Sequence, residues 1–144
     1  MAQYNIKEVS EMFQLPASTL RYYEEQNILT NIKRTASGQR IYEDCHINRL
    51  KTIRCFKQAG MTISQLQEFF AYESAEEENI DSILLLLHSH KEHVITQLEE
   101  LQKSYAHLLR KLHYYEDIKK SLSSNQPLPQ WKDYKFKSFS DDFS

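Results

Sequence analysis

A chain of 144 residues is long enough for one small domain with an extension, and too short for two large domains. It has no run of about 18 consecutive apolar residues, so no membrane span is predicted, and its first residues lack the layout of a signal peptide. The net charge of −2 is unevenly spread: residues 1–60 hold nine Lys/Arg against six Asp/Glu, whereas residues 61–144 hold nine against fourteen. The first part of the chain is therefore basic, and the two cysteines, Cys45 and Cys55, are expected to be free thiols in a reducing cytoplasm.

Two short helices joined by a turn are predicted near the N-terminus. Apolar residues recur at helical spacing over residues 6–13, which predicts the first helix. Pro16 stands where a helix can begin, and a second helix is predicted over about residues 17–26. Asn27 is expected to end it in the left-handed conformation, which Asn tolerates well. Two helices with this spacing fit a helix-turn-helix.

The second helix and the segment after it carry residue types that bind DNA. The polar segment 30–42 predicts a two-stranded wing with Gly38 at its tip. An arginine can reach a base edge or a phosphate, and a tyrosine hydroxyl can donate to a phosphate. Cations on the wing would contact phosphates and fix the register without reading the sequence. The candidate DNA-binding residues are Ser18, Thr19, Arg21, Tyr22, Lys33, Arg34, Arg40 and Tyr42.

Some neighbours of these residues are assigned structural roles. Tyr23 is expected to pack inside, and Glu24 to hold a neighbouring basic residue in place. For Tyr42 two interpretations stay open, a phosphate contact and a packing residue.

Three further helices are predicted. The third spans about residues 44–59 and ends at Gly60. The fourth starts with a capping box at Thr62 and runs to about Tyr72. Ser74 opens another capping-box pattern, which predicts that the last and longest helix begins there.

The last helix carries a coiled-coil seam. Thirteen positions step by four and three residues, and only Lys91 and Lys119 among them are charged. A straight helix would drift off this repeat, so it predicts a coiled coil roughly 60 Å long. The preceding domain is too small to cover such a seam, so a second copy of the chain is the expected partner. The seam residues are Ile80, Leu84, Leu87, Lys91, Val94, Leu98, Leu101, Tyr105, Leu108, Leu112, Tyr115, Lys119 and Leu122.

A linker rich in Ser and Pro, residues 121–129, precedes an aromatic tail. Two interpretations of the tail stay open: it folds back on the long helix or a neighbouring domain and caps a pocket, or it is a partly disordered end. Its aromatic residues are Trp131, Tyr134, Phe136, Phe139 and Phe143.

Two motifs, Thr19-Leu20-Arg21-Tyr22-Tyr23-Glu24 and Gly38-Gln39-Arg40-Ile41-Tyr42, occur in an order and spacing that resemble the MerR family of transcription regulators. The resemblance reaches from Tyr4 to about Tyr115. It implies an all-α fold with a winged helix-turn-helix DNA-binding domain over residues 1–73. A long antiparallel coiled-coil dimerisation helix over residues 74–122 and an accessory tail over residues 123–144 would follow. The chain departs from the family pattern at turns and caps, at Gln14, Pro16, Asn27, Ile32 and Gln39.

The function implied by the resemblance is that of a cytoplasmic homodimer that binds a near-palindromic site in double-stranded promoter DNA. It would distort the DNA in response to a signal so that RNA polymerase can engage the promoter. The effector is unknown, and no cofactor is expected. A coiled-coil adaptor without DNA binding is the alternative, but it leaves the Arg21 helix and the basic wing unexplained. An enzyme is not expected, because the sequence has no glycine-rich phosphate loop and no paired catalytic residues.

Cys55 is a possible redox sensor. The stretch 53–61 resembles a metal-independent subgroup of the family with aldehyde- and redox-responsive members. Arg54 and Lys57 would favour the reactive thiolate of Cys55, although small cysteines are more commonly buried and inert.

No metal site is expected. No cysteine follows Cys55 to supply thiolates at the far end of the long helix. His88 and His93 cannot share one narrow helix face with His90, so solvated or hydrogen-bonded histidines are the favoured interpretation.

Overall fold

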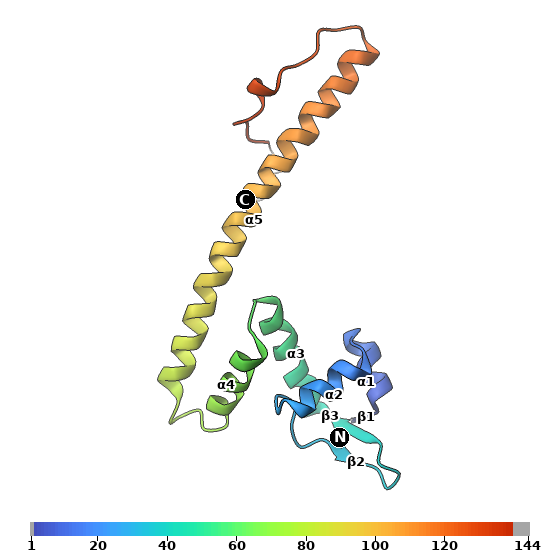
Figure 1. Cartoon of the computed structure of the whole chain (residues 1–144), viewed down its shortest axis with the longest axis vertical. Helices are drawn as coiled ribbons and strands as arrows, with labels where there is room; N and C mark the ends of the chain where they lie inside the picture. The colour runs from blue at the N-terminus through green and yellow to red at the C-terminus, as the bar shows by residue number, and fades with distance from the viewer. Residues whose placement is uncertain (1, 140–144) are drawn as a thin grey trace. The chain divides into compact units, whose positions relative to one another are not determined.

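The computed structural model of the protein describes residues 2–139; the predicted tail residue Phe143 lies outside them. The fold is mostly helical with a small sheet, as predicted (Figure 1). The chain divides near Lys91 into two compact units. The predicted functional division at residues 73 and 122 stays a prediction. The elements are β1 (Gln3–Tyr4), α1 (Ile6–Phe13), α2 (Ala17–Glu25), β2 (Lys33–Arg34), β3 (Arg40–Glu43), α3 (Asp44–Gln58), α4 (Ile63–Glu73), α5 (Ile80–Ser123) and the 3-10 turn η1 (Trp131–Asp133).

The ends of α1 and α2 are set by local hydrogen bonds and by unusual backbone angles. Asn5 caps α1: its side chain accepts from the Glu8 N–H at 2.8 Å, and Glu8 accepts from the Asn5 N–H at 3.0 Å. Gln14 (φ 52°) and Asn27 (φ 61°) both adopt the left-handed conformation. The prediction for Asn27 is confirmed. Gln14 holds the conformation that glycine would adopt more easily, at a cost of about 1 kcal/mol.

Helices α1, α2, α3 and α4 and the beginning of α5 all contribute side chains to the core of the first unit. Leu20 and Tyr23 of α2 are buried in it, so the packing role predicted for Tyr23 is confirmed. Ile83, Leu86 and Leu87 from the beginning of α5 pack against the same core. The other buried members are Val9, Phe13, Ile28, Leu29, Tyr42, Ile47, Leu50, Ile53, Met61, Leu66, Phe69 and Phe70.

The long helix does not begin at Ser74, so that prediction is wrong. α5 begins at Ile80, and Ser74 is instead the C-terminal cap of α4. The Ser74 hydroxyl donates to the Ala71 carbonyl at 2.6 Å, so it satisfies the end of the preceding helix rather than the start of the next. The side chain of Asn79 donates to the Ala75 carbonyl at 3.0 Å and closes the turn before α5. Within residues 2–139, no helix is long and apolar enough to cross a membrane.

A three-stranded antiparallel sheet in the order β1-β3-β2 completes the first unit. Tyr4 of β1 lies opposite Tyr42 of β3, and Arg34 of β2 lies opposite Arg40 of β3. The predicted wing is therefore present as β2 and β3. β1 was not predicted, because a strand of two residues has no measurable alternation.

His46 fastens the beginning of α3 to the segment that follows α2. Its side chain is buried, and Nδ1 accepts from the Glu43 N–H at 2.9 Å. Because Nδ1 is an acceptor, the ring proton belongs on Nε2, which donates to the Thr30 carbonyl at 2.9 Å. The imidazole thus connects the Thr30 carbonyl, before the wing, with the Glu43 N–H at the end of the wing.

We expect His46→Ala to lower the free energy of unfolding by about 2–4 kcal/mol, since it leaves two part-buried backbone groups without this partner and opens a cavity. Urea denaturation followed by circular dichroism measures the change. Cys45→Ala, at an exposed neighbouring position, is the control. A loss equal to that of the control would contradict the structural role of His46.

In the second unit the tail turns back and packs along α5 (Figure 1). The aromatic rings of Trp131 and Tyr134 lie 5.5 and 5.2 Å from that of Tyr114. The Lys111 ammonium lies 3.8 Å from the Trp131 ring, and Arg110 Nε donates to the Lys137 carbonyl at 2.8 Å. Of the two interpretations of the tail, the structure supports folding back for the described residues.

The seam and the tail use different faces of α5. The helix residues that contact the tail include Arg110, Tyr114 and Asp117, which are three or four residues apart and share one face. Leu108 and Leu112 of the seam lie on the other side of the helix and remain exposed. The described tail residues therefore cover their own stripe of α5 and leave these two seam leucines exposed.

Tyr134 fastens the tail through a hydrogen bond that depends on pH. Its hydroxyl donates to Asp117 Oδ2 at 2.6 Å, and this bond, with a contribution from burial, raises the pKa of Tyr134 to about 12. A raised pKa in the folded state stabilises the docked tail below about pH 10, the ordinary pKa of tyrosine, and the stabilisation is lost as the pH rises towards 12.

Release of the tail is therefore expected between about pH 10 and 12. Fluorescence of Trp131, the single tryptophan of the chain, measures it. In Tyr134→Phe the fluorescence change in this range should be much smaller, and an equal change in both proteins would rule out Tyr134 as its source.

Candidate nucleic-acid interface

The outward face of α2 carries three of the predicted residues. Because Leu20 and Tyr23 point into the core, the opposite face of this helix is directed to solvent. Ser18, Arg21 and Tyr22 are exposed on it. Thr19 is half-buried, and its backbone N–H donates to the Pro16 carbonyl in the first turn.

The wing presents the other predicted cations on a tightly hydrogen-bonded hairpin. The Thr35 N–H donates to the Gln39 carbonyl at 2.8 Å, and the Gly38 N–H donates to the Thr35 carbonyl at 2.9 Å. Gly38 has φ of +87°, a conformation that side chains disfavour, which explains glycine at the tip. Lys33 is exposed and lies 3.5 Å from the Glu43 carboxylate.

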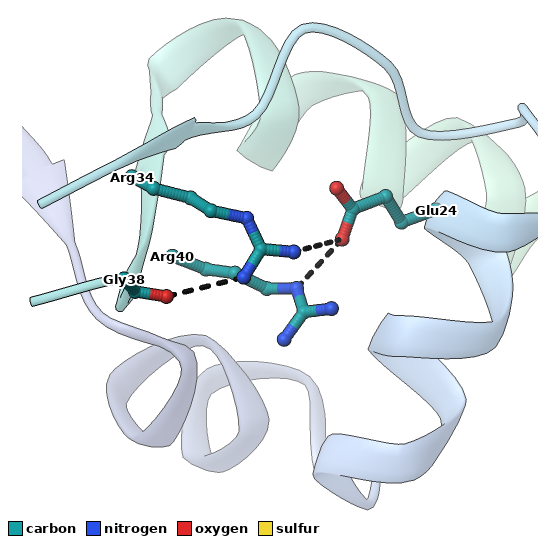
Figure 2. A network of polar contacts seen from close by, with 4 residues as sticks. All are labelled: Glu24, Arg34, Gly38 and Arg40. Carbon is teal, nitrogen blue, oxygen red and sulfur yellow. Dashed lines mark hydrogen bonds and ion pairs between the residues drawn. The ribbon is translucent and has the colours of Figure 1, made fainter.

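Glu24 of α2 reaches the two wing arginines, as Figure 2 shows. Arg40 Nε donates to Glu24 Oε1 at 2.6 Å, and Arg34 Nη2 lies 3.9 Å from the same oxygen. Arg34 Nη1 donates to the Gly38 carbonyl at 3.1 Å. The prediction that Glu24 holds a basic neighbour is confirmed.

A hollow of about 450 Å³ lies where α1, α2 and the wing meet. It brings together two of the predicted residues, Arg21 and Arg40. Lys7 of α1 also lines it, and sequence reasoning missed this residue because only the folded arrangement brings α1 to the wing. Lys33 and Arg34 on the wing add to these cations, and Glu24 and Glu43 offset them only in part, so this part of the surface is basic.

Tyr42 is buried behind this surface, within electrostatic range of Arg21, Arg34 and Arg40. Its side chain is fully buried and stacks edge-on against His46, with ring centroids 6.1 Å apart. Burial raises the pKa of Tyr42, and among the described residues its hydroxyl has no hydrogen-bond partner. Of the two interpretations of Tyr42, the structure supports packing. A phosphate contact by its hydroxyl stays a prediction.

Cys55 is exposed on α3, so the interpretation as a buried thiol is wrong, and its reactivity stays a prediction. Arg54 is turned away towards α1: it donates to the Phe13 carbonyl at 2.5 Å and stacks over the Phe13 ring at 4.7 Å. In the part of the chain that the structure describes, no three His, Cys, Asp or Glu side chains form a group that could hold a metal ion.

Comparison with known proteins finds relatives along most of the chain. The family model described as MerR HTH family regulatory protein matches residues 4–73, and the model described as MerR, DNA binding matches residues 47–111. An uncharacterized HTH-type transcriptional regulator of Haemophilus influenzae is 27% identical over 116 residues, 81% of this chain and 86% of the relative. A ZntR homolog of the same organism, also described as an HTH-type transcriptional regulator, is 32% identical over 94 residues, 65% of this chain and 67% of the relative.

The fold is also similar to solved structures. The crystal structure of HiNmlR, described as a MerR family regulator lacking the sensor domain and bound to promoter DNA, superimposes with a TM-score of 0.73 at 25% identity. The match covers 87% of this chain and 97% of that one. The similarity therefore extends over most of both chains, and that relative is bound to promoter DNA. The chain belongs to the MerR family of DNA-binding transcription regulators.

Proposed function

We propose that the chain acts as a homodimer that binds a near-palindromic promoter site and distorts the DNA in response to a signal. The observation that carries the proposal is the basic surface formed by α2, the wing and α1, with Arg21 exposed beside the hollow that Arg40 and Lys7 also line. Phosphate contacts by such cations supply affinity, and an exposed arginine on a helix can read a base edge.

The apolar seam of α5 supports a dimer. Large leucines on one stripe of the helix are exposed in the single chain, and Leu101 at the middle of the seam is 66% exposed. Contiguous exposed apolar surface of this kind marks an interface. An antiparallel pairing of two copies would cover both seams and relate two basic surfaces by a two-fold axis, which matches the symmetry of a palindromic site.

Distortion of the DNA would be the regulated step. Bending and untwisting a duplex costs several kcal/mol, roughly 1–6 for smooth bends, and phosphate contacts from two wings and two α2 helices can supply it. The relative HiNmlR, solved on promoter DNA, supports binding at promoters. RNA polymerase at the same promoter and a site of action in the cytoplasm are part of the proposal, and the effector is unidentified.

Selection from a random duplex library tests the proposal without knowledge of the target. The enriched sequences should contain inverted repeats, and sedimentation of a labelled duplex should give two chains per site. Enrichment of single half-sites bound by one chain would contradict the dimer. Failure to enrich any duplex would contradict DNA binding and favour the coiled-coil adaptor.

The sensor hypothesis for Cys55 makes a separate prediction. Because Cys45 and Cys55 are both exposed, both thiols should react with a chromogenic disulfide reagent in the folded protein. Cys55→Ser should leave DNA affinity unchanged and abolish any change in DNA binding caused by an aldehyde or a peroxide. Cys45→Ser is the matched control. A Cys55→Ser protein that still responds would exclude the thiol as the sensor.

A further inference from the structure

We infer that Glu24 is a positioning residue that holds the wing on α2 through Arg40. Arg34 is then the wing arginine whose guanidinium leaves Glu24 and binds a DNA phosphate. The inference rests on the proposed function, since it assigns roles within the same basic surface. It separates two arginines that the sequence had grouped as equivalent phosphate contacts.

The need for Glu24 follows from the register of the wing. Arg34 and Arg40 are directly opposite each other on neighbouring strands. Like charges in this arrangement repel and destabilise a strand pair. Glu24 Oε1 contacts both guanidinium groups, as Figure 2 shows, so one carboxylate of α2 offsets the repulsion and ties the hairpin to the helix.

The two contacts of Glu24 are unequal. Arg40 Nε donates at 2.6 Å, a short charge-assisted hydrogen bond, and the Arg40 side chain is only 19% exposed. Arg34 Nη2 lies 3.9 Å from the carboxylate, beyond hydrogen-bond distance, and its side chain is 48% exposed. An exposed, long ion pair contributes little, so Arg34 can exchange partners at low cost whereas Arg40 cannot.

Arg34 is also oriented for this exchange. Its Nη1 donates to the Gly38 carbonyl at 3.1 Å, which holds the guanidinium against the wing tip. Nη2 can leave Glu24 for a phosphate oxygen while Nη1 keeps its bond to Gly38. The free protein thus gives Arg34 Nη2 a distant carboxylate partner, which it can leave for a phosphate while Glu24 stays bound to Arg40.

The salt dependence of DNA affinity tests the two roles. The wild-type chain, Arg34→Gln and Arg40→Gln are titrated onto one selected inverted-repeat duplex at several salt concentrations. Loss of one phosphate contact lowers the slope of log K against log salt by about 0.9, or twice that for a symmetric dimer. Arg34→Gln should lower the slope by this amount, whereas Arg40→Gln should weaken binding with the slope unchanged. A lowered slope for Arg40→Gln, or an unchanged slope for Arg34→Gln, overturns the assignment.

Charge-matched variants test Glu24. Glu24→Gln and Glu25→Gln each remove one negative charge from α2, and Glu25 is exposed at the neighbouring position. If Glu24 acted only as a charge that repels DNA, both variants would bind more tightly. As a positioning residue, Glu24→Gln should weaken binding about fivefold, the size of effect typical for a partly exposed charge-assisted bond, whereas Glu25→Gln should not. Equal behaviour of the two variants overturns the inference.

A double variant distinguishes a specific pairing of Glu24 with Arg40 from a general loss of folding. If Glu24 and Arg40 act as one unit, Glu24→Gln combined with Arg40→Gln should bind no more weakly than the worse single variant. Additive losses overturn the inference, and thermal melting confirms that each variant is folded. If the wild-type chain binds no duplex, the proposed function itself is contradicted. If the wild-type chain binds but the variants do not show the expected affinities and salt slopes, only the roles assigned to Glu24, Arg34 and Arg40 are contradicted.

Discussion

Replacing Leu101 by glutamate is expected to convert the proposed dimer into a monomer and to remove nearly all specific DNA binding. Leu101 stands at the middle of the seam and is exposed in the single chain, so in a dimer it would be buried against the partner. Burying a leucine contributes about 1.5–3 kcal/mol, and a carboxylate at the centre of an apolar seam adds a desolvation cost. Sedimentation velocity measures the oligomeric state, and fluorescence anisotropy with a selected duplex measures binding.

Gln102→Glu is the matched control, because it adds the same charge at the next position, outside the seam. It should remain dimeric and bind DNA. A Leu101→Glu protein that is still dimeric would show that α5 does not pair through this stripe. If it were monomeric with unchanged affinity, two-fold recognition of the DNA would be wrong.

Replacing Arg21 by alanine is expected to lower DNA affinity about tenfold to a hundredfold. Arg21 is exposed on α2 and lines the hollow beside Arg40, so its guanidinium can reach a base edge or a phosphate. Loss of a bidentate arginine contact to a base costs about 1–3 kcal/mol and relaxes the preference at that position, whereas loss of a phosphate contact weakens all sequences alike and lowers the salt slope by about 1. Anisotropy titrations with the selected duplex and with single-base variants separate the two outcomes.

Lys51→Ala, at an exposed position of α3, removes the same charge from another part of the first unit. It should change affinity far less than Arg21→Ala. If the two variants were equal in affinity and salt slope, Arg21 would contribute only through the overall electrostatic potential of the protein and not through a direct contact with DNA.

The helices were largely predictable because their signals are local. Periodic apolar residues and capping patterns placed α1 and α3 within a residue of their observed ends. The same pattern failed at Ser74, because a hydroxyl can satisfy the end of one helix or the start of the next, and only the fold decides which. The strand β1 was missed because its stability comes from pairing with β3, about forty residues away.

The roles of the candidate site residues were less predictable than their identity. Composition indicated that arginines and tyrosines cluster near α2 and the wing, but it did not reveal that Tyr42 turns inward. The strand register that places Arg34 opposite Arg40 is likewise invisible in the sequence, and so is the short bond from Arg40 to Glu24. These features depend on contacts between residues distant along the chain.

The described tail residues pack on one side of α5, and the exposed seam leucines lie on the other side. The proposed pairing of two copies through the seam leucines would therefore leave the described contacts of each tail in place.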